Sequence, residues 1–222
     1  MSARRLAAAL AVVLAVAAIT GCGVPLDSSP RAVVAATTTT TSDGEPAVNE
    51  EGDSTAFLYF IANNQLINLD QDIPSRRPTD VLTALFSGVP IGASKDVVSQ
   101  IPTGTRLLGA EQSGTVLDVN VSKDFDNLVG AGRAQATAQI VMTATDLSGI
   151  DEVSLRIEGQ PTQVFSQVRG DADRVGACDY IGLLPTEDVL ATWPLDRKSQ
   201  RHLTTRRNML DAQCPQAPAA GN

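Results

Sequence analysis

The chain has 222 residues, of which 43% are hydrophobic and only 4% aromatic, so its core has to be built from Val, Leu, Ile and Ala. Its formal charge is -8 at pH 7. This acidity argues against nucleic acid as a partner, because a phosphate backbone requires a basic surface.

The N-terminus has the pattern of a bacterial lipoprotein signal. Arg4 and Arg5 form a short basic segment, and the apolar run that follows has 14 residues, Leu6–Ile19, too few for an ordinary membrane-spanning helix. The run ends in Ile19-Thr20-Gly21-Cys22, which resembles a lipobox. A plain signal peptide with a chance cysteine, or a short membrane anchor, are the alternatives.

We therefore predict a signal peptide over residues 1–21 and a lipid on Cys22, with a diacylglyceryl group and palmitate-type chains. Removal of the signal takes away two arginines and no acidic residue, which leaves a formal charge of -10. The predicted location is the extracytoplasmic face of the cell membrane.

Residues 22–54 have the composition of a disordered tether. They contain five consecutive threonines, Thr37–Thr41, followed by a segment rich in Ser, Asp, Gly and Glu, and they show no apolar periodicity. O-glycosylation of the threonine run is an alternative role for this segment.

A hairpin and a helix open the folded part. The apolar run Ala56–Ile61 is typical of a central strand, and Asn63-Asn64 suits a tight turn into a second strand over Gln65–Asp72. Pro78 begins a helix that Thr79 or Asp80 could cap and that Gly88 and Pro90 end. The apolar residues of this helix fall on one face.

A strand–helix–strand unit follows. Strands are predicted over 105–110 and 116–121, a short helical turn over 124–129, a long helix over Arg133–Leu147 and a strand over 153–157. Gln163–Phe165 is a possible hairpin partner of the last strand. These elements predict one α/β (α+β) domain with a mixed sheet and two helices packed on one of its faces.

The order and spacing of these segments resemble the GerMN domain, first described in spore germination lipoproteins. The resemblance covers residues 55–168. Within it the chain is similar to lone-GerMN lipoproteins of actinobacteria and to the N-terminal part of the LpqB lipoproteins. It implies an extracytoplasmic domain that makes protein–protein contacts in the cell envelope, without catalytic residues. It is carried by Phe57–Phe60, Leu85–Pro90, Ile101–Thr105, Val116–Ser122, Gln139–Thr145 and Val153–Gly159.

Residues 169–222 form a C-terminal extension with predicted helices over 187–193 and 196–210. Cys178 and Cys214 bracket these helices. Outside the cytoplasm a disulfide between them is the favoured interpretation, and it would fix the last helix to the domain. Two free buried thiols or a metal site are the alternatives, and the single histidine makes the metal site the weaker one.

The last predicted helix is basic in an acidic chain, since it carries Arg197, Lys198, Arg201, Arg206 and Arg207 besides His202. One interpretation is a solvated helix face neutralised by the domain's own acids. The other is contact with anionic lipid, wall polymer or an acidic partner.

The sequence lacks the usual catalytic and phosphate-binding motifs, and we expect no cofactor and no metal. The acidic pairs Asp124 and Asp126, and Asp171 and Asp173, lie in polar segments where solvation is the default. We therefore expect a non-enzymatic interaction module that binds another envelope protein. The alternative is a protein that binds cell-wall polymer or a small ligand as an accessory to an envelope enzyme or sensor.

Overall fold

The computed structural model describes residues 54–214, which belong to one compact unit, and it begins with the predicted hairpin. Strands β1 (Ser54–Ala62) and β2 (Gln65–Ile73) pair antiparallel along their whole length. Asn63 and Asn64 form the turn with φ angles of 48° and 62°. Asparagine tolerates this left-handed conformation better than other residues with a side chain, which explains the pair at this position.

A second sheet contains the strand–helix–strand unit. Its strand order is β3-β4-β5-β6, with β4 and β5 parallel to each other and β9 paired with the other end of β5. The parallel pair requires a crossover connection, and α3 supplies it. The bounds are β3 (Leu107–Ser113), β4 (Val116–Val121), β5 (Glu152–Ile157), β6 (Gln160–Thr162) and β9 (Val175–Gly176).

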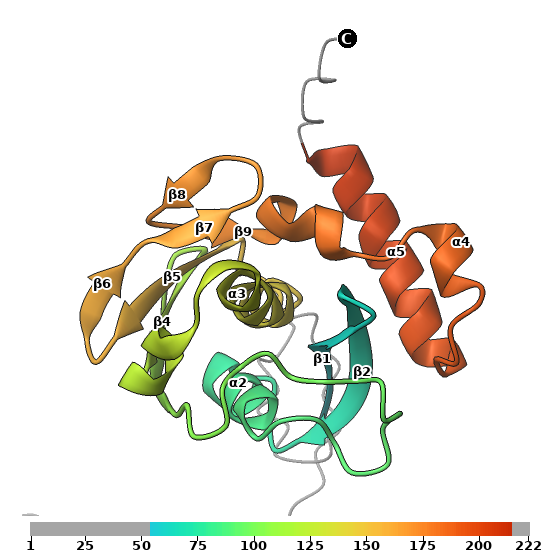
Figure 1. Cartoon of the computed structure of the whole chain (residues 1–222), viewed down its shortest axis with the longest axis horizontal. Helices are drawn as coiled ribbons and strands as arrows, with labels where there is room; N and C mark the ends of the chain where they lie inside the picture. Colours follow the sequence, from blue (N-terminus) through green and yellow to red (C-terminus); the bar gives the residue numbers. More distant parts are fainter. Residues whose placement is uncertain (1–53, 215–222) are drawn as a thin grey trace, which may run out of the picture. The chain divides into compact units, whose positions relative to one another are not determined.

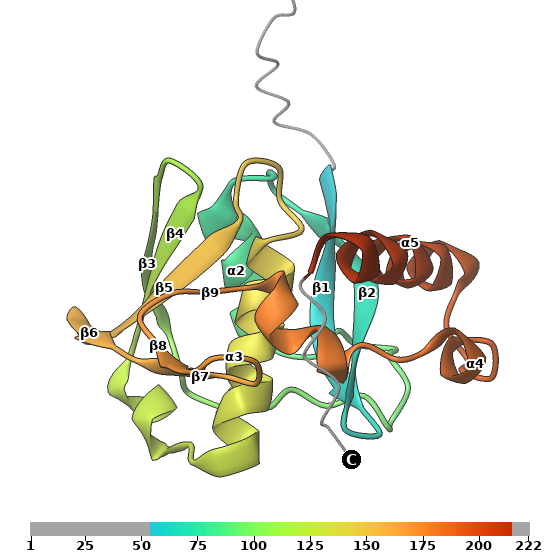
Figure 2. The same cartoon turned by 90° about the horizontal axis from the view of Figure 1, so that it is seen from above.

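Helix α3 (Gly130–Ala144) lies between the sheet and the β1–β2 hairpin, as both views show (Figures 1 and 2). Nine consecutive residues of this helix, Ala136–Ala144, are buried. The sequence suggested one buried side, but a helix enclosed by layers on both sides is buried all round.

Helix α2 (Pro78–Phe86) packs beside α3 and against β3, while the 3-10 turn η1 (Lys123–Asn127) precedes α3. The predicted cap of α2 by Thr79 or Asp80 is wrong, because the N-cap position is Arg77 and no side chain caps the helix. Asp80 instead accepts hydrogen bonds from Ser75 and Arg77.

Strand β1 is not the central strand of a sheet, contrary to the prediction. Its second edge is closed by side chains of α3: Thr143 Oγ1 accepts from the Tyr59 amide at 3.0 Å, and Gln139 Nε2 donates to the Tyr59 carbonyl at 3.0 Å. Gln139 Oε1 also accepts from the Gln100 amide, and Ile61 forms a β-bridge with Val98. Burial between layers, rather than strands on both edges, explains the apolar character of β1.

The C-terminal extension folds over both sheets. Gln163–Phe165 does not pair with β5 as suggested; β6 does, because the tight Glu158-Gly159 turn returns the chain immediately. The remaining elements are β7 (Val164–Ser166), β8 (Gly170–Ala172), the 3-10 helix η2 (Ala177–Leu183), α4 (Glu187–Leu190) and α5 (Arg197–Gln213). Helix α5 covers the outer face of the hairpin (Figure 1). The helices within residues 54–214 are too short or too polar to cross a membrane.

Candidate functional site

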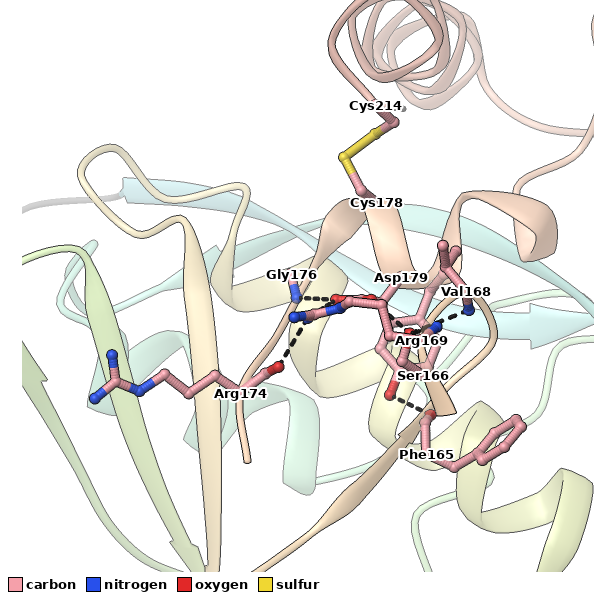
Figure 3. A network of polar contacts seen from close by, with 10 residues as sticks. Phe165, Ser166, Val168, Arg169, Arg174, Gly176, Cys178, Asp179 and Cys214 are labelled. Carbon is pink, nitrogen blue, oxygen red and sulfur yellow. Dashed lines mark hydrogen bonds and ion pairs between the residues drawn. A yellow bond between two sulfur atoms is a disulfide. The ribbon is translucent and has the colours of Figure 1, made fainter. Parts of the chain in front are cut away.

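The most elaborate polar arrangement in the described chain lies where the extension joins the domain. The predicted disulfide is present: Cys178, on η2, is bonded to Cys214, directly after α5, with Cα atoms 5.4 Å apart. Figure 3 shows this bond linking the end of α5 to the network below it. The predicted pairing of the two cysteines is therefore confirmed, but the bridge attaches α5 to η2 of the extension, which in turn packs on α3 of the domain.

Asp179 forms the centre of the polar network in Figure 3. Its carboxylate accepts from Ser166 Oγ, from the Gly176 amide at 2.7 Å, and from Arg169 Nε at 2.9 Å and Nη2 at 2.8 Å. Arg169 Nη2 also donates to the Arg174 carbonyl. A single carboxylate thus joins β7, the β7–β8 turn, β9 and η2.

The protonation states in this network follow from burial and hydrogen bonding. Burial by itself would raise the pKa of Asp179, but hydrogen bonds from Arg169, Ser166 and Gly176, and the charge of Arg169, outweigh it and hold that pKa below its usual value. Burial raises the pKa of Tyr180, whose hydroxyl donates to the Phe165 carbonyl. Asp179 is therefore ionised and Tyr180 neutral at pH 7.

A cleft of about 380 Å³ opens beside the disulfide, between the domain and α5. One wall comes from the turn after α3 and the start of β5, the second from the β7–β8 turn and η2, and the third from α5. The lining residues are Thr145, Ile150, Asp151, Glu152, Val168, Arg169, Gly176, Ala177, Cys178, Asp179, Arg206, Leu210 and Gln213.

Both arginines of the cleft are already engaged by the protein itself. Arg169 is held by Asp179, and the side chain of Arg206 is only 11% exposed. Arg206 Nη2 donates to the carbonyl of Thr145 at 2.8 Å and to its hydroxyl at 2.9 Å, while Nε lies 3.7 Å from Asp146. Their charges hold the extension in place.

The rest of the inner face of α5 is attached in the same way. Lys198 Nζ pairs with Asp70 of β2, and His202 Nε2 lies 3.0 Å from the carboxylate of Asp146. The His202 ring stacks on Phe57 of β1 with ring centroids 3.8 Å apart. The N-terminal end of α5 is capped by Asp196, which accepts from two backbone amides of the first turn.

The five basic residues singled out in α5 therefore divide into two groups. Lys198, Arg206 and Arg207 bind within the chain, Arg207 through the Leu184 carbonyl and Asp211. Arg197 and Arg201 are exposed, and both line a shallower hollow of about 410 Å³ between α4 and α5.

The other candidate residues lie apart from the cleft. Cys22 and its lipid lie outside the described residues. In the turn before α3, Asp124 accepts from Ser122, and Asp126 pairs with Arg133. Asp173 accepts from Gln163, and Asp171 is exposed. Within residues 54–214 no three acidic, histidine or cysteine side chains gather as a metal site would require.

Sequence reasoning missed the Asp179 network entirely. Ser166, Arg169 and Asp179 have no helical or strand spacing, and their elements are only two to seven residues long. The one available signal was an acidic residue next to Cys178 in an otherwise apolar segment, because a buried carboxylate needs partners.

Comparisons with known proteins agree with the resemblance. Residues 57–163 match the sequence model of the family described as Germane, sporulation and spore germination. No curated protein matches the chain.

Several solved structures are similar to it. The tandem GerMN domains of the sporulation protein GerM from Bacillus subtilis share 19% identity with a TM-score of 0.46, over 57% of this chain and 47% of that chain. The first of those domains shares 20% identity with a TM-score of 0.45, over 55% and 97%. A candidate lipoprotein from Clostridium perfringens shares 18% identity with a TM-score of 0.41, over 63% and 97%.

The chain thus spans about half the length of the tandem structure and nearly all of the other two. Residues 57–163 thus match the Germane family model, and the described chain has a GerMN-like mixed α+β fold with a disulfide-linked C-terminal extension.

Proposed function

We propose that this protein is a lipid-anchored, extracytoplasmic module of the cell envelope whose GerMN domain binds another protein and catalyses no reaction. The lipid on Cys22 would keep it at the membrane, and residues 22–54 would let the domain reach its partner. The family description, sporulation and spore germination, supports a role in the envelope.

One observation carries the non-enzymatic part of the proposal. Arg169 is bound by Asp179 within the extension, and Arg206 is bound by Asp146 and the Thr145 carbonyl, so its charge is used in holding α5. A catalytic group has to present its charge or its proton to a reactant. The geometry of the described cleft is therefore that of a structural contact between α5 and the rest of the chain.

The test is site-specific photo-crosslinking in living cells. A photoreactive residue is placed at one of three exposed apolar positions, Ile91, Val129 or Phe165. We expect one position to capture a discrete protein, and the same position in Cys22→Ser to capture much less. If none of the three positions captured a protein although the variants were present at normal abundance, the proposed role as an interaction module would be contradicted.

The alternative is a protein that binds wall polymer or a small ligand, and the cleft is the observation that favours it. The measurement is titration of soluble peptidoglycan fragments into the protein, followed by NMR. Under this alternative the shifts would centre on the cleft and disappear in Val168→Trp, which narrows it.

The exposed Arg197 and Arg201 supply a further surface of the same proposal, contact with an anionic partner. Salt-sensitive pull-down of the partner should be lost in Arg197→Ala/Arg201→Ala. The matched control is Arg76→Ala, at an exposed arginine outside α5, and it should keep the pull-down. Equal pull-down by both variants would rule out this surface.

A further inference from the structure

Helix α5 rests on a face of the GerMN domain that we call the α5 seat. It consists of Phe57 on β1, Asp70 on β2 and Asp146 after α3, each of which contacts a side chain of α5. Each of these residues lies inside the stretch 57–163 that matches the family, whereas α5 lies outside it. The seat therefore belongs to the domain, and the helix that covers it is an addition.

Three side chains of α5, regularly spaced along the helix, contact the seat. Lys198 pairs with Asp70, His202 stacks on Phe57 and meets Asp146, and Arg206 binds the turn after α3. Their positions are i, i+4 and i+8, which place them along one face of a helix. The contact thus has the form of helix recognition by charge and ring stacking.

The contact is far more polar than the core of the domain. Among the described residues, seven buried side-chain atoms have no hydrogen-bond partner in the protein, and six of them lie in β1, β2 and α5. They are the Tyr59 hydroxyl, both amide atoms of Asn68, Asp70 Oδ1, Ser199 Oγ and Arg206 Nε. The Tyr59 hydroxyl and the Asn68 side chain lie near each other, so the atoms of this set that concern α5 directly are Asp70 Oδ1, Ser199 Oγ and Arg206 Nε.

Such a contact gains little from apolar burial. Each buried polar atom without a partner costs free energy, and only Leu203 and Leu210 of α5 are buried apolar residues. What compensates is the covalent link from Cys178 to Cys214 at the end of the helix, which keeps the local concentration of α5 at the seat high.

We propose that the α5 seat is a recognition site for a basic amphipathic helix, which α5 occupies within its own chain. The partner that fits is a helix of another protein with a lysine or arginine, a histidine or similar ring, and an arginine at four-residue intervals. This inference rests on the proposed function, because it names the chemistry of the partner of the same domain.

The experiment uses the full chain, with α5 altered so that it no longer competes with an added peptide for the α5 seat. Lys198→Ala/His202→Ala/Arg206→Ala is combined with Cys178→Ser/Cys214→Ser, and hydrogen exchange of β1 and β2 verifies that the hairpin remains folded. A labelled peptide of residues 196–213 is then titrated by fluorescence anisotropy. We expect saturable binding, at least tenfold weaker for the peptide with alanine at 198, 202 and 206.

Asp70→Asn/Asp146→Asn in the same background supplies the control on the seat and should weaken binding at least tenfold. Equal binding of both peptides, binding that ignores the two aspartates, or no binding to a folded hairpin would overturn the proposal. If the combined variant does not fold, the triple alanine variant with its disulfide retained is titrated with and without reductant, under the same criteria.

Failure of this test remains distinguishable from failure of the proposed function. Loss of peptide binding with crosslinking intact would mean that the partner uses another surface. A mixed dimer between the emptied variant and the reduced wild type would support the seat and identify a second copy of the chain as the source of the helix.

Discussion

Asp179 is the residue on which the order of the extension depends most directly. It is 5% exposed and receives donors from three separate elements. Asp179→Ala leaves the Gly176 amide and Ser166 without their acceptor, so we expect the free energy of unfolding to fall by about 2–3 kcal/mol. Urea denaturation measures this, and Asp171→Ala, at an exposed position, should change it by less than about 0.5 kcal/mol.

The same residue predicts a pH dependence. Its folded pKa is lower than that of an unfolded aspartate, so the unfolded state binds the proton more readily and stability falls as the pH is lowered. The contribution is complete above about pH 4 and is lost as the pH drops through the folded pKa. Urea denaturation at a series of pH values should show a smaller acid loss in Asp179→Asn than in wild type. Parallel profiles for the two proteins would contradict this.

At the level of elements, Gln139 shows how α3 holds the hairpin. It is fully buried and serves the Tyr59 carbonyl and the Gln100 amide at once. Gln139→Leu leaves the buried Tyr59 carbonyl and the partly buried Gln100 amide without this partner, and the free energy of unfolding should fall by about 2–4 kcal/mol. Gln160→Leu, an exposed glutamine in β6, is the matched control and should change stability by no more than about 0.5 kcal/mol in thermal and urea denaturation.

The disulfide is the second element-scale device, since it closes a segment of 36 residues. Cys178→Ser/Cys214→Ser should lower the stability by about 2–4 kcal/mol, through the greater freedom of the unfolded chain. Calorimetry of wild type with and without reductant provides the control. Reduced wild type and the double variant should coincide, and a large difference between them would show that the serines act in another way.

The regular elements could be predicted from the sequence because their periodicity is local. The hairpin, both helices of the domain and strands β4 and β5 were found in this way. Strands β6 to β9 have two or three residues each, too few to carry an alternating pattern. The long helix was placed three residues late, because its first turn, Gly130-Ala131-Gly132, lacks strong helix formers.

At the level of the whole molecule, the arrangement of the layers explains the burial of β1, which the sequence alone could not. The apolar run Ala56–Ile61 predicted a central strand, but β1 is covered by α3 on one side and by α5 on the other. Local patterns cannot say which of two distant segments will supply that cover. The disulfide could be predicted, because two spare cysteines in a chain with a predicted export signal favour pairing.

The predicted anchor can be tested on the whole molecule. Cys22→Ser removes the acyl acceptor, and the protein should move from the membrane fraction to the soluble extracytoplasmic fraction. Fractionation followed by immunoblotting measures the shift, with Cys178→Ser/Cys214→Ser as a control that keeps Cys22. Retention of Cys22→Ser in the membrane at wild-type level would exclude lipidation as the anchor.

The bonds from Tyr59 to Thr143 and Gln139 have a consequence for the order of assembly. The two ends of the first bond are 84 residues apart in sequence, and those of the second are 80. Because the hairpin precedes both partners in the chain by so many residues, one edge of β1 stays open until α3 packs against it. A chaperone that binds exposed strand edges would bind this chain before α3 packs and would no longer bind it afterwards.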